Sequence, residues 1–132
     1  MPNNIILLVA RVLLSFMFIM SGIQKFGGIG GTAGYIGSVG LPAPMLLAWL
    51  AAIVETIGGI AILVGFQTRI AALAIAGFCV LAAVLFHFQP SDQMEMISFM
   101  KNLTIAGGLL ALFVSGPGDL SVDGRSGRLA TA

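Results

Sequence analysis

The sequence predicts an all-α, integral membrane four-helix bundle, and three observations support this prediction. Hydrophobic residues make up 58% of the 132 residues and charged residues only 8%, whereas a soluble domain carries roughly a quarter charged residues. The apolar residues gather in four runs, each close to the roughly 20 residues that cross a bilayer as a helix. These runs do not alternate with a period of two, and a helix satisfies its backbone hydrogen bonds internally, as the bilayer requires.

The first predicted span covers about residues 5–25. Asn3 or Asn4 can cap its first turn, and the glycine-rich segment 27–31 ends it. We expect it to remain in the membrane rather than act as a cleaved signal peptide. The reason is that no basic region precedes it and Arg11 interrupts its apolar run.

The connection to the second span contains one further predicted feature. Thr32–Val39 is too short to cross a bilayer, and Tyr35 and Ile36 predict a short piece that lies at the membrane surface. The second predicted span covers about residues 43–65, and Pro44 suits its first turn because proline is tolerated at a helix start.

A tight turn separates the second predicted span from the third. Gly65 suits the C-cap of one helix and Thr68 the N-cap of the next. The third span covers about residues 69–88 and the fourth about residues 97–115. The remainder, residues 119–132, is a polar tail that we predict to be loosely ordered.

Basic residues are distributed unequally between the two ends of the predicted bundle. Four arginines fall on the side of both termini and two lysines on the other side: Arg11, Arg69, Arg125 and Arg128 against Lys25 and Lys101. Because cytoplasmic segments of membrane proteins carry an excess of lysine and arginine, this bias favours a cytoplasmic location for both termini.

Composition also argues against several classes of function. The formal net charge is only +1, which does not suggest a nucleic-acid partner. The single cysteine, Cys79, cannot form an intramolecular disulfide. One histidine and one cysteine cannot build a zinc site within one chain, and we expect no metal. Phosphate-binding and hydrolase motifs are absent from the sequence.

Glu55 lies near the middle of the second predicted span, and its neighbours three and four positions away are all small: Ala51, Ala52, Gly58 and Gly59. Small residues mark helix contacts in membranes, so the carboxylate should point into the bundle. Counted from the cytoplasmic side, Arg11 lies roughly 9 Å deep and Glu55 roughly 15 Å deep. This depth predicts an Arg11–Glu55 ion pair, which either handles protons or ligand or only fixes the helix register.

A second polar group is predicted at the opposite end of the bundle. Lys25 ends the first span and His87 the third, while Lys101 and Asn102 lie in the first turns of the fourth. Lys25 and His87 share helix faces with small residues, which directs both side chains inward. Alternatively, the lysines extend to lipid head groups and His87 is a plain interfacial histidine.

The order and spacing of these residues resemble the DoxX family of small bacterial inner-membrane proteins over nearly the whole chain. The pattern combines Arg11, Leu13, Leu14, Phe16, Phe18, Gly22 and Lys25 with Gly40 and Pro42, Glu55 before Gly58 and Gly59, Gly65, Phe66, Thr68, Arg69, Ala71 and Ala72, then His87, Lys101, Asn102, Gly116, Pro117, Gly118, Ser121 and Asp123. The resemblance implies a four-helix membrane bundle. It also implies that the family's polar positions fall on Arg11, Lys25, Glu55, His87 and Asn102.

Some members of the DoxX family are linked to redox work, as membrane partners of oxidoreductases or as a thiosulfate:quinone oxidoreductase subunit. The resemblance therefore implies a redox or quinone-linked role. Direct thiosulfate oxidation is not expected, because the cysteine chemistry of a sulfur enzyme is missing apart from Cys79.

The leading hypothesis is a membrane component of a redox or quinone-linked process that holds a small amphipathic ligand inside the bundle. No covalently bound cofactor is expected, so quinone is the candidate ligand and an oxidoreductase the candidate partner. The first alternative is a small transporter or a proton or solute permeation protein, which needs a homo-oligomer to form a full carrier. The second alternative is a non-catalytic assembly subunit that docks a soluble enzyme through residues 119–132.

Overall fold

The computed structural model describes residues 2–131, and this part of the chain is helical with no strand. The elements in order are α1 (Pro2–Gly27), α2 (Ile29–Ser38), α3 (Pro44–Val64), α4 (Thr68–Ala82), the π-helix η1 (Ala83–His87), α5 (Gln93–Ser115) and α6 (Val122–Thr131). Four helical segments in this part are long and apolar enough to cross a membrane: Asn3–Gly27, Pro44–Val64, Thr68–His87 and Gln93–Ser115. The predicted all-α membrane fold is therefore confirmed.

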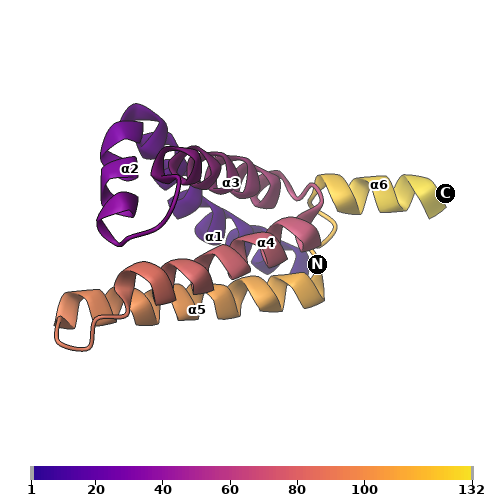
Figure 1. Ribbon diagram of the computed structural model, residues 1–132. Coiled ribbons are helices and arrows are strands. Elements are labelled where there is room, and N and C mark those ends of the chain that lie inside the picture. Colours follow the sequence, from indigo (N-terminus) through magenta and orange to yellow (C-terminus); the bar gives the residue numbers. More distant parts are fainter. Residues whose placement is uncertain (1, 132) are drawn as a thin grey trace.

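The four spans are arranged as two helix pairs (Figure 1). Helix α1 packs mainly on α3, α4 packs mainly on α5, and the contact between α3 and α4 joins the pairs. The N-terminus, the α3–α4 turn and α6 lie at one end of the bundle, which we call the terminal end. Helix α2 and η1 lie at the opposite end, which we call the α2 end.

The buried core lies where the two pairs meet. Its largest apolar members are Phe18, Ile62, Ile75, Leu109 and Leu112, which come from α1, α3, α4 and α5. Small residues on α4 and α5, Ala72, Ala76, Cys79 and Ala106, complete the cluster. Small side chains allow membrane helices to approach closely, and the large ones then fill the space between the pairs. Most other large apolar side chains face outward, as expected when lipid is the solvent.

Helix α2 is more than a surface segment. Its Ala33 and Ile36 are buried against Ala48 of α3, while Tyr35 remains half exposed. The prediction of a short piece near the membrane surface is therefore incomplete, since one face of α2 belongs to a second small core.

Helix α5 begins at Gln93, four residues before the predicted start at 97. Asp92 explains the difference, because its carboxylate caps the helix by accepting hydrogen bonds from the backbone N–H groups of Met94 and Glu95. The earlier start brings Glu95 into the first turn of α5.

The prediction of a loosely ordered tail is wrong for the residues that the structure describes. Residues 116–123, which we call the strap, cross the terminal end and include the first two residues of α6, which projects away from the bundle (Figure 1). Two hydrogen bonds hold the strap to α1: Asn4 Nδ2 donates to Asp119 Oδ2 at 3.1 Å, and the Asp119 N–H donates to Asn4 Oδ1 at 3.1 Å. Ala132 lies outside the described residues.

Candidate functional site

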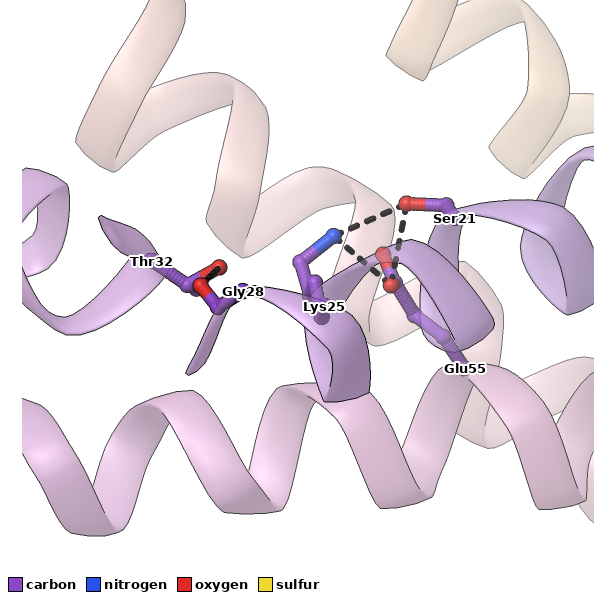
Figure 2. A network of polar contacts seen from close by, with 5 residues as sticks. All are labelled: Ser21, Lys25, Gly28, Thr32 and Glu55. Atoms are coloured by element: carbon purple, nitrogen blue, oxygen red, sulfur yellow. Dashed lines mark hydrogen bonds and ion pairs between the residues drawn. The ribbon is translucent and has the colours of Figure 1, made fainter. Parts of the chain in front are cut away.

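A charged cluster lies in the interface between α1 and α3 (Figure 2). The ammonium of Lys25 donates to Glu55 Oε2 at 2.8 Å and to Ser21 Oγ at 2.8 Å. The Ser21 hydroxyl in turn donates to the same Glu55 oxygen at 3.1 Å. The side chain of Glu55 is 7% exposed and that of Lys25 24% exposed. A carboxylate that is largely withdrawn from solvent thus faces a cation and a hydroxyl group.

The local sequence explains why these three groups meet. Ser21 and Lys25 are four residues apart on α1, so their side chains lie on one helix face. Side chains in a helix lean toward its N-terminus, so Lys25, in the last turn of α1, leans back into the bundle. Glycines allow α1 and α3 to approach: a Cβ atom on Gly22 would lie 2.9 Å from the backbone nitrogen of Thr56, and one on Gly59 would lie 3.1 Å from that of Ile19.

Arg11 does not pair with Glu55, so the predicted ion pair is wrong. Its guanidinium donates from Nη1 to the carbonyl oxygen of Leu63 at 3.0 Å and from Nη2 to that of Leu120 in the strap. Arg11 is fully buried. The last carbonyl groups of a helix lack intrahelical donors, and Arg11 supplies one to the C-terminal turn of α3.

Asp123 performs the complementary role at the start of α4. Its Oδ1 and Oδ2 accept the N–H groups of Gln67 and Thr68, both at 2.8 Å, and its own N–H donates to the Gly65 carbonyl at 2.8 Å. Burial alone would raise the pKa of Asp123. The hydrogen bonds from Thr68 and Gln67 and the charge of Arg11 outweigh burial and lower the pKa from its ordinary value of 3.8.

His87 joins a different cluster at the α2 end. Its Nδ1 lies 2.7 Å from Glu95 Oε2 of α5. Phe86, also in η1, stacks on Tyr35 of α2 with ring centroids 5.3 Å apart. Burial and the negative charge of Glu95 raise the pKa of Tyr35 from its ordinary value of 10.0. The cluster therefore links α2, η1 and α5 at one end of the bundle.

The remaining predicted residues are not brought into the Lys25–Glu55 cluster. Lys101 is exposed and lines a shallow, mainly apolar pocket on α5 with Ile97, Met100, Thr104 and Ile105. Asn102 is half-buried. Of the six residues predicted for the site, the structure joins only Lys25 and Glu55 directly, and it places Arg11 and His87 in separate clusters.

Sequence analysis assigned no site role to three contributors: Ser21, Glu95 and Asp123, the last of which it named only within the DoxX pattern. Ser21 could have been found from its position one helical turn before Lys25. Glu95 could have been found only from a correct start for α5. The pairing of Asp123 with the first turn of α4 crosses more than fifty residues and leaves no local signal.

Comparisons with known proteins place these residues in a wider context. The DoxX family model matches residues 6–88. Inner membrane protein YqjF of Escherichia coli (strain K12) is 47% identical over 116 residues, which cover 88% of each chain. Inner membrane protein YphA of the same organism is 38% identical over 92% of this chain and 90% of that protein. The putative oxidoreductase CatD of Bacillus subtilis (strain 168) is 29% identical over 75% of each chain. No solved structure matches significantly.

Proposed function

Since the chain belongs to the DoxX family of membrane proteins, we propose that it is a membrane component of a redox-linked process. In this proposal Lys25, Ser21 and Glu55 bind the polar head of a small amphipathic ligand such as a quinone. The apolar part of the ligand remains among helices or lipid. The electron donor or acceptor is a partner oxidoreductase, because the sequence contains no motif for a bound electron carrier.

The hydrogen-bonding capacity of Lys25 is the observation that carries this proposal. An ammonium group has three N–H bonds, and two of them are used by Ser21 and Glu55. Within the described residues the third N–H has no hydrogen-bond acceptor. Because the Lys25 side chain is partly exposed, this third N–H can donate to a carbonyl oxygen of a ligand at the site.

Glu55 gives the site its second chemical capability. Its carboxylate neutralises Lys25 and can accept a hydrogen bond from a hydroxyl group, such as that of a reduced quinone. Lys25 as donor and Glu55 as acceptor would together recognise both the carbonyl oxygen of an oxidised quinone and the hydroxyl group of a reduced one. The printed name of the relative CatD, a putative oxidoreductase, supports a redox setting of this kind.

Quinone binding to the purified protein in lipid nanodiscs tests the proposal. We expect the native protein to bind a quinone analogue with a short tail. Lys25→Met should reduce the affinity about tenfold or more, since losing one hydrogen bond from a charged donor costs roughly 1.5–3 kcal/mol. Ser21→Ala should reduce the affinity less, because it removes only a group that positions Lys25.

Lys101→Met is the matched control, because it removes the same ammonium group from an exposed position outside the cluster. It should leave the affinity unchanged. Equal binding by the native protein and Lys25→Met, or no binding by the native protein, would contradict the proposal.

Proton or solute permeation is a second candidate function, and the burial of Glu55 within a membrane span favours it. In this case proteoliposomes that contain the protein should show a proton or solute flux that Glu55→Gln abolishes. Glu95→Gln is the control, because Glu95 is a carboxylate at the end of the bundle and is 31% exposed. Flux without quinone binding would favour permeation over the redox-linked role.

A further inference from the structure

We infer that the Lys25–Glu55 site is open only at the α2 end of the bundle and is sealed against the terminal end. The identity of the ligand rests on the proposed function. The sealing is argued only from the burial and position of residues between the site and the terminal end. It predicts that ligand and protons reach the site from one side of the membrane.

The order of residues along α1 provides the first step. Its inward face carries Arg11, Ser15, Phe18, Ser21 and Lys25 in sequence from the terminal end toward the α2 end. The first three are almost completely buried, at 0%, 0% and 2% exposure. Ser21 and Lys25, which lie closer to the α2 end, are both partly exposed.

An apolar layer between the charged site and the terminal end forms the first barrier. Phe18 of α1, Ile62 of α3 and Ile75 of α4 belong to one buried cluster, and each is at most 2% exposed. Ile62 lies seven residues beyond Glu55 on α3, which is roughly 10 Å along the helix axis. A layer of large apolar side chains at native packing density leaves no space for a water molecule, so it separates Glu55 from the terminal end.

The strap forms a second barrier at the terminal end itself. Arg11 is held there by carbonyl groups of α3 and the strap. At the same end, the strap residue Ser121 packs against Gly65. A Cβ atom added to Gly65 would overlap with the Ser121 side chain. The strap is fixed on the other side by Asp123, which binds the first turn of α4. The two terminal nitrogens of Arg11 and the carboxylate of Asp123 are thus occupied by partners at this end.

At the α2 end, the Lys25 side chain keeps 24% of its surface exposed, whereas Arg11 at the terminal end is fully buried. Gln24 and Phe26, the neighbours of Lys25 in the chain, are exposed, and Phe26 packs on the exposed Trp49 with ring centroids 5.8 Å apart. Amphipathic aromatic side chains such as tryptophan are typical of the membrane–water interface. The last turn of α1 therefore places Lys25 where a head group at interfacial depth can reach it.

Cysteine accessibility tests the inference without any ligand. In a Cys79→Ala background, which removes the one native cysteine, single cysteines are introduced as Ser21→Cys and Ser15→Cys. Gln24→Cys and Ser126→Cys are exposed reporters for the α2 end and the terminal end. A small, charged, membrane-impermeant methanethiosulfonate is added from outside to two vesicle preparations. In one the α2 end of the protein faces outward, and in the other the terminal end does.

We expect Ser21→Cys to react from the side that labels Gln24→Cys and not from the side that labels Ser126→Cys. Ser15→Cys should react from neither side. Reaction of Ser21→Cys from the Ser126 side, or from neither side, would overturn the inference. If Ser21→Cys does not fold, Lys25→Cys serves as the second reporter with the same expected sidedness.

The outcome is independent of the quinone experiment. One-sided labelling together with absent quinone binding would refute the proposed ligand and retain the sealed geometry. Quinone binding together with two-sided labelling would refute only the seal.

Discussion

Lys25, in the last turn of α1, lies 2.8 Å from Glu55 in the middle of α3, and the two side chains share the hydroxyl of Ser21. Each charge is therefore neutralised by the opposite charge on the other helix, and the Ser21 hydroxyl adds a hydrogen bond to both. Because both groups lie within membrane spans, removing either one leaves a partner that has little water to stabilise it.

Lys25→Met should destabilise the protein by roughly 2–4 kcal/mol. Removing one partner of a fully buried pair costs about 3–5 kcal/mol, and the partial exposure of Lys25 reduces this cost. The free energy of unfolding in detergent micelles measures the effect. The double variant Lys25→Met/Glu55→Gln should recover part of the loss, because no unpaired charge remains. A double variant that is less stable than either single variant would contradict this account.

Gly65→Ala should destabilise the terminal end by roughly 2–4 kcal/mol. Gly65 has a φ of +74°, which costs an L-residue about 1–2 kcal/mol. The added methyl group would also overlap with Ser121 and lie 2.6 Å from Nη1 of Arg11, which adds roughly 1–3 kcal/mol of overpacking. Thermal unfolding measures the loss. Gly77→Ala is the control, since its Cβ atom would meet nothing within 4 Å and should not be destabilising.

Gly22→Ala should separate α1 from α3 and weaken the charged site. Its Cβ atom would lie 2.9 Å from the backbone nitrogen of Thr56, and a backbone atom cannot move aside as a flexible side chain can. We expect a loss of roughly 1–3 kcal/mol in stability together with lower quinone affinity. Gly107→Ala on α5, whose Cβ atom would meet no neighbour, should change neither quantity. A native-like Gly22→Ala protein would show that the close approach is not required.

Asp123 should make stability depend on acidic pH. Its pKa is lowered in the folded protein, so the stabilisation is fully present above the ordinary value of 3.8 and is lost as the pH falls through the lower folded value. Asp123→Asn should therefore reduce stability at neutral pH, and the difference from the native protein should shrink as the medium is acidified. A difference that stays constant down to strongly acidic pH would exclude this linkage.

Tyr35 should ionise above its ordinary pKa of 10.0, because burial and the charge of Glu95 both oppose the phenolate. It is the single tyrosine of the chain, so the near-ultraviolet absorbance of tyrosinate reports on it alone. Glu95→Gln should lower the pKa of Tyr35 but not return it fully to 10.0, since burial is the larger cause. An identical titration in the native protein and Glu95→Gln would show that the two side chains do not interact.

The four spans could be predicted from the sequence because the bilayer constrains them strongly: length, hydropathy and helix-ending glycines all point to the same segments. The inward direction of Glu55 could also be predicted, since small residues surround it on α3. These features depend on local sequence and on the solvent, and neither requires knowledge of how the helices are paired.

The partner of Glu55 was predicted wrongly because depth was counted from Cα positions. Side chains lean toward the N-terminus of a helix, so the Arg11 side chain extends toward the terminal end and away from Glu55, while that of Lys25 leans back toward it. Arg11 instead meets the carbonyl group of Leu63 in the last turn of α3. Correcting the count for side-chain direction would have favoured Lys25.

The strap could not be predicted, because its contacts join residues that are distant in sequence. Asp123 has an ordinary polar context in the chain, and only the folded bundle places it at the first turn of α4. The same is true of Leu120, whose backbone carbonyl binds Arg11 and would do so with almost any side chain.

The position of the strap has a consequence for biosynthesis. Ribosomes produce residues 119–123 after all four spans, so Leu120 and Asp123 are synthesised after the residues that they contact at this end. Until then Arg11 lacks one acceptor and the first turn of α4 lacks its cap. The terminal end therefore cannot complete its hydrogen bonds until residues 119–123 have left the ribosome.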